Sequence, residues 1–195
     1  MKMVLLEKQT EFILEAKVDT FYLVLLDKNT SVGKIKVDLI LKKSGVNCRL
    51  LFLGKLQSKS SWQIESNMRH LVPKTSCLTE VFLTQSNESR IDYFGQIYID
   101  RLASQTKSFL KEQSLILGKA TYNRSRPILE IFNNQVKASH SASSSRLDEA
   151  DLFYLMSRGF KKVEAEKILE EAFFNKVLDS IKVETARKLI KDYLC

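Results

Sequence analysis

The stretch that decides the fold is KASHSASSSRLDEADLFYLMSRG, residues 137–159, because the periodicity of the chain changes within it. Before it, short runs rich in Val, Ile, Phe and Tyr alternate with polar clusters, a pattern typical of strands separated by turns. After it, apolar residues recur at three- and four-residue spacings, which is typical of amphipathic helices. The sequence therefore predicts a mainly β body over residues 1–146 and a small α-helical domain over residues 147–195.

Within this body, short strands are predicted from Thr10 to about Lys137. They are Glu11–Val18, Phe21–Leu26, Gly33–Leu41, Asn47–Leu53, Trp62–Asn67, Leu78–Thr84, Ile91–Ile99, Ser114–Leu117 and Ile128–Phe132. The segment Arg101–Gln113 interrupts them and is expected to be a helical turn or an irregular crossover. Regular short strands allow a sandwich, a barrel or a parallel solenoid, and the absence of Asn-Gly and Asp-Gly dipeptides disfavours tight hairpins.

The position of Cys48 in a predicted strand indicates that it belongs to the core. In Asn47–Leu53 the two-residue period of a strand places Cys48, Leu50 and Phe52 on one face. Cys48 is therefore predicted to be a small buried residue and not a metal ligand.

Three helices are predicted after the junction. Asp148 suits an N-cap, and Gly159 suits the position after a C-cap, so the first helix is expected over Asp148–Arg158. Similar apolar spacing predicts a second helix from Val163 to Asp179 and a third from Glu184 to Leu194. A helical unit this small is marginal alone, so it is expected to dock on the strands or to offer an apolar side to a partner.

Composition and charge narrow the classes of function. The 195 residues carry a formal net charge of +8, and the excess lies before Leu147, which suits nucleic acid, an acidic protein or an anionic ligand as partner. No RNA-recognition signature is present, so nucleic acid is a secondary interpretation. The longest apolar runs fall far short of the roughly 20 residues that span a bilayer, and no signal peptide is recognisable. We expect a cytoplasmic protein with no membrane segment, and the three widely spaced cysteines predict reduced thiols.

Motifs of common enzyme classes are absent, and one histidine suits metal binding. The chain has no G-x-S-x-G sequence, no phosphate loop and no histidine cluster, so a zinc hydrolase, a serine hydrolase or a nucleotide hydrolase is not expected. His140 follows the last predicted strand among small side chains that leave its ring accessible. Imidazole in such a place can bind iron or another borderline metal, and a structural histidine is the alternative.

Three motifs around the junction follow one another in a fixed order. They are P-I-L-E-I at residues 127–131, V-K-A-S-H-S-A at 136–142 and L-F-Y-L-M-S-R-G at 152–159. In order and spacing they resemble the SufB/SufD family of iron–sulfur cluster assembly proteins, and the resemblance covers roughly residues 69–178. It implies a right-handed parallel β-helix followed by a C-terminal helical domain.

The resemblance also implies a function and partners. In the family, a SufB/SufD-like pair of subunits sits on two copies of a SufC-type ABC ATPase, and a nascent Fe–S cluster forms at the interface of the pair. The ATPase binds the C-terminal helices. In this chain the implied contacts are Tyr154, Arg158, Phe173 and Phe174.

The same resemblance bears on the cluster site. His140 matches the SufD-type histidine, whereas Ser141 stands where the SufB pattern has a glutamate, and Ala138 stands where a cysteine often precedes the SufD histidine. One histidine cannot hold a cluster, so a partner subunit must supply the other ligands. Two alternatives stay open: a degenerate structural partner without cluster chemistry, and a basic β-solenoid that binds an anionic polymer through its lysine-rich strands.

Overall fold

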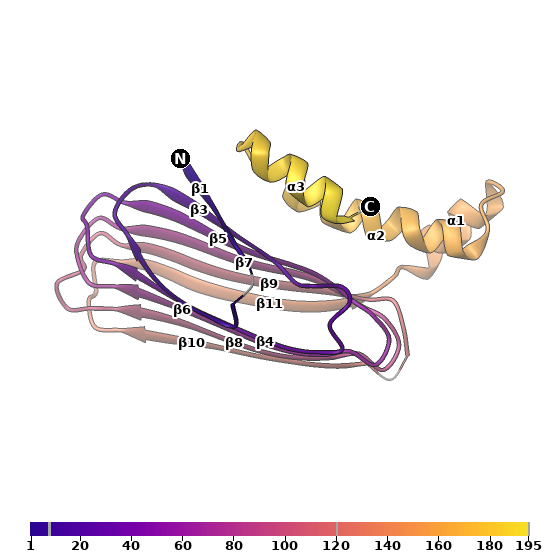
Figure 1. Ribbon diagram of the computed structural model, residues 1–195, viewed down its shortest axis with the longest axis horizontal. Coiled ribbons are helices and arrows are strands. Elements are labelled where there is room, and N and C mark those ends of the chain that lie inside the picture. The colour runs from indigo at the N-terminus through magenta and orange to yellow at the C-terminus, as the bar shows by residue number, and fades with distance from the viewer. Residues whose placement is uncertain (8, 120, 195) are drawn as a thin grey trace.

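The computed structural model describes residues 1–7, 9–119 and 121–194, and they form a two-layered parallel β-solenoid followed by three C-terminal helices (Figure 1). The strands are β1 (Lys2–Leu6), β2 (Glu11–Ala16), β3 (Thr20–Leu25), β4 (Val32–Leu41), β5 (Asn47–Leu56), β6 (Ser61–His70), β7 (Ser76–Gln85), β8 (Arg90–Ile99), β9 (Lys107–Ile116), β10 (Tyr122–Ile131) and β11 (Lys137–Arg146). The predicted parallel β-helix with a helical C-terminal part is confirmed.

Successive strands alternate between two sheets. Sheet A has the order β1-β3-β5-β7-β9-β11, and sheet B has the order β10-β8-β6-β4-β2, with every neighbouring pair parallel. Each turn of the solenoid, here called a rung, adds one strand to each sheet. Asn47, Ser76, Lys107 and Lys137 therefore occupy the same position in successive rungs of sheet A.

Two expectations about the strands are wrong. Arg101–Gln113 is not a helical turn, because β9 begins at Lys107 within it, and His140 does not follow the last strand, because it lies inside β11. Both strands turn polar residues such as Ser108 toward the interior, so they lack the apolar alternation by which strands are recognised. Ladder pairing with the preceding rung, which is invisible in the local sequence, makes them strands.

Inward-facing side chains of the two sheets form the main hydrophobic core. Cys48, Leu50 and Phe52 belong to it together, as predicted, and so does the fully buried Tyr93. Several polar groups in this interior are hydrogen-bonded to one another. His70 Nδ1 lies 2.8 Å from Thr75 Oγ1, and its Nε2 lies 3.0 Å from Ser108 Oγ.

The tail contains the three expected helices, α1 (Glu149–Ser157), α2 (Lys162–Leu178) and α3 (Glu184–Leu194). The Asp148 carboxylate accepts a hydrogen bond of 2.8 Å from the Ala150 amide, and Gly159 has φ of 97°, so the predicted cap and stop of the first helix are confirmed. The division of the chain into units 1–146 and 147–195 stays a prediction.

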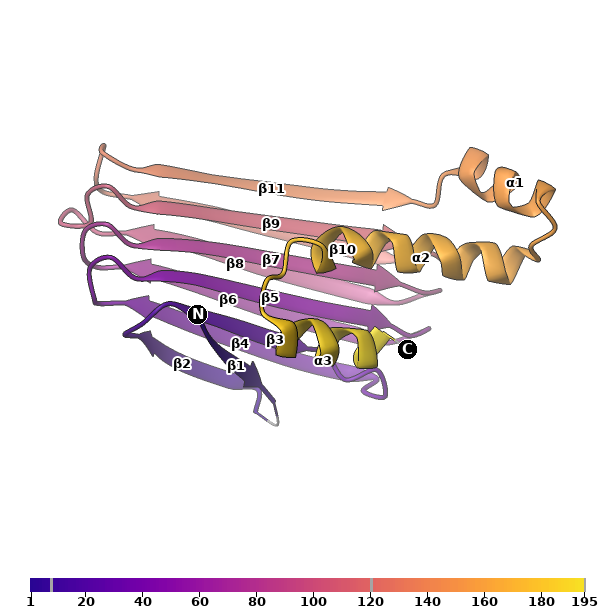
Figure 2. The ribbon, with the colours of Figure 1, turned by 90° about the horizontal axis from the view of Figure 1, so that it is seen from above.

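The helices α2 and α3 cover the outer face of sheet A, whereas no described helix covers sheet B (Figures 1 and 2). The strands reflect this difference, because β5 is buried on both faces and β4 alternates between buried and partly exposed residues. The second hydrophobic cluster joins Leu51, Leu53 and Phe82 of sheet A to Val177 of α2 and Ile190 of α3. The tail therefore docks on the strands of its own chain.

Polar contacts fix the position of the docked tail. Glu170 of α2 accepts a hydrogen bond of 2.6 Å from Thr84 and forms an ion pair of 3.1 Å with Lys55. The Tyr193 hydroxyl of α3 donates to the Leu26 carbonyl at 2.7 Å and accepts from the Lys55 amide at 3.1 Å. It thus bridges two backbone groups of neighbouring rungs, just beyond the end of β3.

Candidate functional site

The last rung of the solenoid leaves the ends of both sheets open. β11 pairs with β9 and β10 pairs with β8, and no further strand within the described residues covers their other edges. Both edge strands have ten residues. The exposed large apolar side chains at this end belong to β10 or follow it directly: Tyr122, Ile128, Leu129, Ile131 and Phe132. A long open edge with exposed apolar side chains is a surface on which another chain can pair.

His140 lies on this open rung. Its register partner is Leu110, whose side chain belongs to the interior core, and residues paired in a parallel sheet share a face. His140 is therefore on the interior side of β11, but it is exposed because no rung in the described part of the chain follows it. Ala138 lies on the same side, whereas Ser141 alternates to the outer side. The position matching the SufB glutamate thus faces away from the position of His140.

A carboxylate that the sequence analysis did not identify lies one rung below. Glu112 is the register partner of Ala142 and is only 2% exposed. The Ser114 hydroxyl donates to it, and burial raises the pKa of its carboxyl above the ordinary value. The alternation of Ser108, Leu110, Glu112 and Ser114 could have placed it in the interior, had Arg101–Gln113 been recognised as containing a strand.

The first helix of the tail offers a second exposed apolar surface. None of the residues of α1 is buried, and Phe153 and Tyr154 are 73% and 56% exposed. Figures 1 and 2 show α1 extending beyond the ends of the strands, away from sheet A. The Arg158 guanidinium lies 5.2 Å from the centre of the Tyr154 ring, so these two predicted contacts form one exposed pair.

The other two predicted contacts are placed differently. Phe173 and Phe174 are 8% and 1% exposed. The Phe173 ring packs against Phe82 of sheet A at 5.6 Å between centroids and against Phe174 at 5.3 Å. These two residues hold α2 on the solenoid, and direct contact with a partner stays a prediction that requires α2 to leave sheet A.

The thiols of Cys48 and Cys77 and the imidazole of His70 are in the interior. Cys48 and Cys77 are register partners on β5 and β7, and both are buried. Burial raises the pKa of the Cys48 thiol to about 11 and that of Cys77 further, so both thiols are protonated at neutral pH. Cys195 lies outside the described residues. Across the part of the chain that is described, no three His, Cys, Asp or Glu side chains come together as a metal site.

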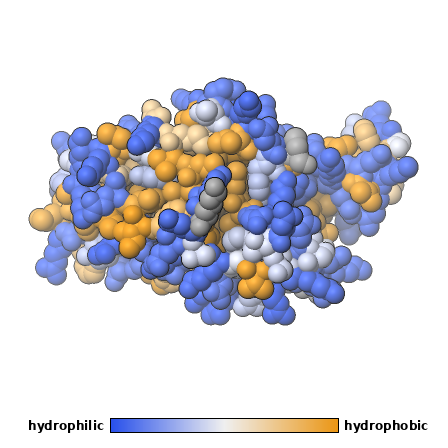
Figure 3. Space-filling view, viewed as in Figure 1, coloured by the Kyte–Doolittle hydropathy of each residue, from blue (hydrophilic) through white to orange (hydrophobic). Residues whose placement is uncertain are grey.

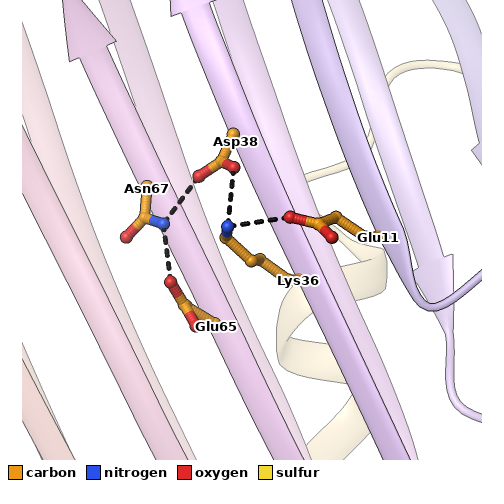
Figure 4. A network of polar contacts seen from close by, with 5 residues as sticks. All are labelled: Glu11, Lys36, Asp38, Glu65 and Asn67. Atoms are coloured by element: carbon orange, nitrogen blue, oxygen red, sulfur yellow. Dashed lines mark hydrogen bonds and ion pairs between the residues drawn. The ribbon is translucent and has the colours of Figure 1, made fainter.

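The outer face of sheet B carries the lysine-rich strands, and carboxylates neutralise much of their charge. Lys36 forms ion pairs with Glu11 at 2.8 Å and Asp38 at 3.2 Å, and Asn67 links Asp38 to a further carboxylate, Glu65 (Figure 4). Arg126 pairs similarly with Asp92, and Lys42 with Glu15. An anionic polymer would have to compete with these internal carboxylates, which weakens that alternative.

These features define the class of protein: a two-sheet parallel β-solenoid that packs its own helical tail on one sheet and leaves its last rung and α1 exposed. Residues 8–173 match the family model of the SufBD core domain of SUF system FeS cluster assembly. The chain therefore belongs to the SufBD family.

Individual relatives agree with this assignment. The chain is similar to proteins from Staphylococcus aureus and Staphylococcus haemolyticus, each named "Iron-sulfur cluster assembly SufBD family protein". Each is 29% identical over 150 residues, which cover 75% of this chain and 32% of the relative. The chain thus spans 32% of the length of the curated relatives that it matches. Among the described helices, none combines the length and the apolar character that crossing a membrane requires.

Proposed function

We propose that this chain is a non-enzymatic, SufB/SufD-like subunit of an iron–sulfur cluster assembly complex. The observation that carries the proposal is the coexistence of two exposed surfaces in a chain of this family: the open last rung with His140, and the apolar helix α1. The first suits a second β-solenoid subunit, and the second suits a SufC-type ABC ATPase. The two free buried thiols, Cys48 and Cys77, support the reducing cytoplasm as its setting.

The ATPase is proposed to bind through α1. Phe153 and Tyr154 offer exposed aromatic area beside the Arg158 guanidinium, and aromatic and arginine side chains are enriched at the energetic centres of interfaces. ATP-driven closure of the ATPase pair would pull on α1. Because α2 and α3 are packed on sheet A, the tail would transmit that motion to the solenoid.

The nascent cluster is the cargo of the complex and is proposed to form where the last rung meets the second subunit. His140 supplies one imidazole ligand from the interior side of β11, and the Glu112 carboxylate lies one rung below. Thiolates are the usual ligands of Fe–S clusters, and the buried thiols of this chain are too deep to act. The second subunit would therefore supply the remaining ligands.

Co-purification with the cognate ATPase tests the docking site. Tyr154→Ala should weaken binding about tenfold or more, because it removes an exposed aromatic side chain and the stacking partner of Arg158. Ile13→Ala is the matched control, since Ile13 is 70% exposed on β2, a strand that lies at the opposite end of the solenoid from α1 in Figure 2. Retention of the ATPase at wild-type levels by Tyr154→Ala would rule out this docking site.

Anaerobic reconstitution of the complex with iron and sulfide tests the cluster site. His140→Ala should give weaker visible absorption than the wild type. Ser139→Ala is the control, because Ser139 lies on the opposite face of the same strand. Equal spectra for His140→Ala and wild type would remove His140 from the site.

A degenerate structural partner is the second candidate function. Ser141 stands where the SufB pattern has a glutamate, and Ala138 stands where a cysteine often precedes the SufD histidine. Both favour a chain that keeps ATPase binding and has lost cluster chemistry. Co-purification of the ATPase together with no effect of His140→Ala on the reconstituted spectrum would identify this case.

A further inference from the structure

One edge of the solenoid carries a line of cations. The turns that lead from a strand of sheet B to the next strand of sheet A are residues 17–19, 42–46, 71–75, 100–106 and 132–136. They lie at the end of the strands away from α1, at the left of Figure 2. The exposed cations of these turns and of the strand starts after them, here called the basic ridge, are Lys17, Lys43, Lys74, Arg101, Lys107 and Lys137. None of the six forms an ion pair with a described residue.

The turns are stacked in register, which keeps the ridge cations in line. Gly45, Lys74 and Gln105 all have left-handed φ, of 80°, 59° and 57°, two residues before a strand of sheet A begins. The Lys74 amide donates to the Ser104 carbonyl of the next turn at 2.9 Å. The Gln105 amide donates in the same way to the Gln135 carbonyl at 2.7 Å. Because neighbouring strands lie about 4.8 Å apart, the five turns place the ridge along a line of about 20 Å.

Carboxylates near the ridge are fewer, and each already has a partner. Asp19 and Asp100 lie within the turns, and each accepts a hydrogen bond from a backbone amide, at 2.8 Å and 3.0 Å. At the strand ends beside the turns, Glu15 pairs with Lys42, and Glu130 accepts a hydrogen bond from a glutamine. The six ridge cations outnumber these carboxylates, so this edge has a positive potential.

The opposite edge of the solenoid has both signs of charge. In the turns that lead from sheet A to sheet B, the described charged residues are Glu7, Asp27, Lys28, Lys59, Glu88 and Lys119. Charges that serve only solubility are normally of mixed sign, as they are there. A single sign along one edge is instead what selects an oppositely charged partner.

The last two turns of the ridge enclose a surface hollow of about 340 Å³. Lys107 and Lys137 line it, together with Thr106 and Val136. The two lysines are register partners on β9 and β11, and both are exposed. Like charges on adjacent strands of one sheet destabilise each other. A carboxylate placed between the two ammonium groups would relieve this repulsion.

The residue types of the ridge favour carboxylates of a polypeptide over nucleic acid. Five of the six cations are lysines, which act as point charges without the planar fork of arginine. Proteins that bind single-stranded nucleic acid combine a basic groove with aromatic side chains on which bases stack. The five turns contain one aromatic residue, Phe132. A line of about 20 Å matches about six residues of an extended polypeptide.

We propose that the basic ridge binds an extended, Asp- and Glu-rich segment of a partner protein, with one acidic side chain seated between Lys107 and Lys137. The inference goes beyond the proposed function, because the ridge lies on the turns at the far end of the strands from α1. The charges steer an acidic protein to this edge and make its binding dependent on salt.

Fluorescence anisotropy with labelled peptides tests the ridge on the full-length chain. The probe is a peptide of about eight residues with alternating Glu and Ser, and its neutral counterpart has alternating Gln and Ser. A single-stranded oligothymidylate of about the same length tests nucleic acid. The ridge variant carries Lys74→Gln, Lys107→Gln and Lys137→Gln, and the control variant carries Lys34→Gln, Lys59→Gln and Lys119→Gln at the opposite edge.

The two variants are matched. Each loses three exposed lysines that have no ion pair with a described residue. Each also replaces one lysine with left-handed φ, Lys74 or Lys59, and Gln105 shows that glutamine adopts this conformation here. Thermal unfolding verifies that both variants fold.

The wild type should bind the Glu-Ser peptide more tightly than the Gln-Ser peptide and the oligothymidylate. The ridge variant should bind the Glu-Ser peptide about tenfold more weakly than the wild type, because three charge pairs are lost. The control variant should differ from the wild type by less than about twofold. Raising the salt concentration should weaken the binding.

Equal weakening in the two variants would overturn the inference, because net charge and not the ridge would then attract the peptide. Oligothymidylate binding as tight as that of the Glu-Ser peptide would overturn it in favour of nucleic acid. Absence of a preference for Glu-Ser over Gln-Ser would overturn it as well. None of these outcomes touches the ATPase binding and cluster formation that test the proposed function.

Discussion

The two histidines of the chain show how the closed and the open part of the solenoid differ. His70 of β6 and His140 of β11 both lie on the interior side of their strands. Another rung covers His70, which is fully buried and hydrogen-bonded through both ring nitrogens, whereas His140 is exposed. His70 is therefore a structural group, whereas the ring of His140 is accessible to a ligand. The two positions differ in whether a further described rung covers them.

The same contrast divides the tail. Both α1 and α2 carry pairs of adjacent aromatic residues, Phe153 with Tyr154 and Phe173 with Phe174. The first pair is exposed and the second pair is buried on sheet A. Aromatic content therefore does not identify a partner surface, and the position of the helix relative to the sheet does. Figure 3, seen from the side of β1 and β2, shows that the solenoid also exposes apolar side chains at its other end.

The largest expected effect on stability comes from the buried aromatic pair of α2. Phe174→Ala should lower the free energy of unfolding by about 3 to 5 kcal/mol, because it leaves a cavity between α2 and sheet A. Phe153→Ala, the exposed counterpart in α1, should change it by less than about 0.5 kcal/mol. Urea unfolding followed by circular dichroism measures both. Similar losses for the two variants would erase the distinction between α1 and α2.

His70 should make the closed part sensitive to acid. Burial lowers the pKa of His70 from 6.5 to about 4, so the unfolded chain binds more protons between these two values. The free energy of unfolding should therefore fall by about 3 kcal/mol as the pH drops through this window. Glu112, whose pKa is raised, acts in the opposite direction and reduces the net change.

Nuclear magnetic resonance separates the His70 contribution from the rest. With only two histidines in the chain, each ring can be assigned by replacing His140 with Ala. The ring signals of His70 should stay unshifted until the pH falls well below 6. Titration of His70 near its ordinary value would show that the interior is open to water.

A smaller effect is expected from the bridge between α3 and the solenoid. Tyr193→Phe removes the hydroxyl that joins the Leu26 carbonyl to the Lys55 amide and should cost about 1 to 3 kcal/mol, because both backbone groups lose a partner. Thermal unfolding measures the loss. Lys28→Ala is the control, because its ammonium lies 4.8 Å from the Tyr193 ring without taking part in the bridge. An unchanged melting temperature for Tyr193→Phe would show that water replaces the hydroxyl.

The smallest effect on stability is expected in the open part. His140→Ala and Tyr154→Ala should each change the free energy of unfolding by less than about 0.5 kcal/mol, since both side chains are exposed and have few contacts. Chemical denaturation of the isolated chain measures this. A loss above about 1 kcal/mol would mean that any functional defect of these variants reflects folding and not a site.

Much of the secondary structure could be predicted from local sequence. The N-cap at Asp148 and the end of the helix before Gly159 could be predicted because each depends on the chemistry of one residue. Most apolar strands could be predicted, because burial on one or two faces leaves an alternating or continuous pattern, whereas β1 was not predicted. β11 was not, because its serines carry no such pattern and only the ladder with β9 holds them extended.

The candidate site was predictable only in part. The motif containing His140 and the exposed residues of α1 could be identified from their sequence, because each lies within one short segment. Glu112 could not be connected with His140, since the two meet only when β9 and β11 become neighbours. The burial of Phe173 and Phe174 likewise depends on where α2 lies on the solenoid.

The sequence by itself determined the family, the strand-to-helix transition after residue 146 and the helix ends, because these depend on residues close together in the chain. Tertiary structure alone decided which aromatic pair is covered, that the interior side of β11 is open, and that Lys137 lies beside Lys107. The physical reason is that burial and charge repulsion arise between rungs. Residues about thirty positions apart become neighbours there. The local sequence of a strand does not indicate which of its faces the next rung or the tail covers.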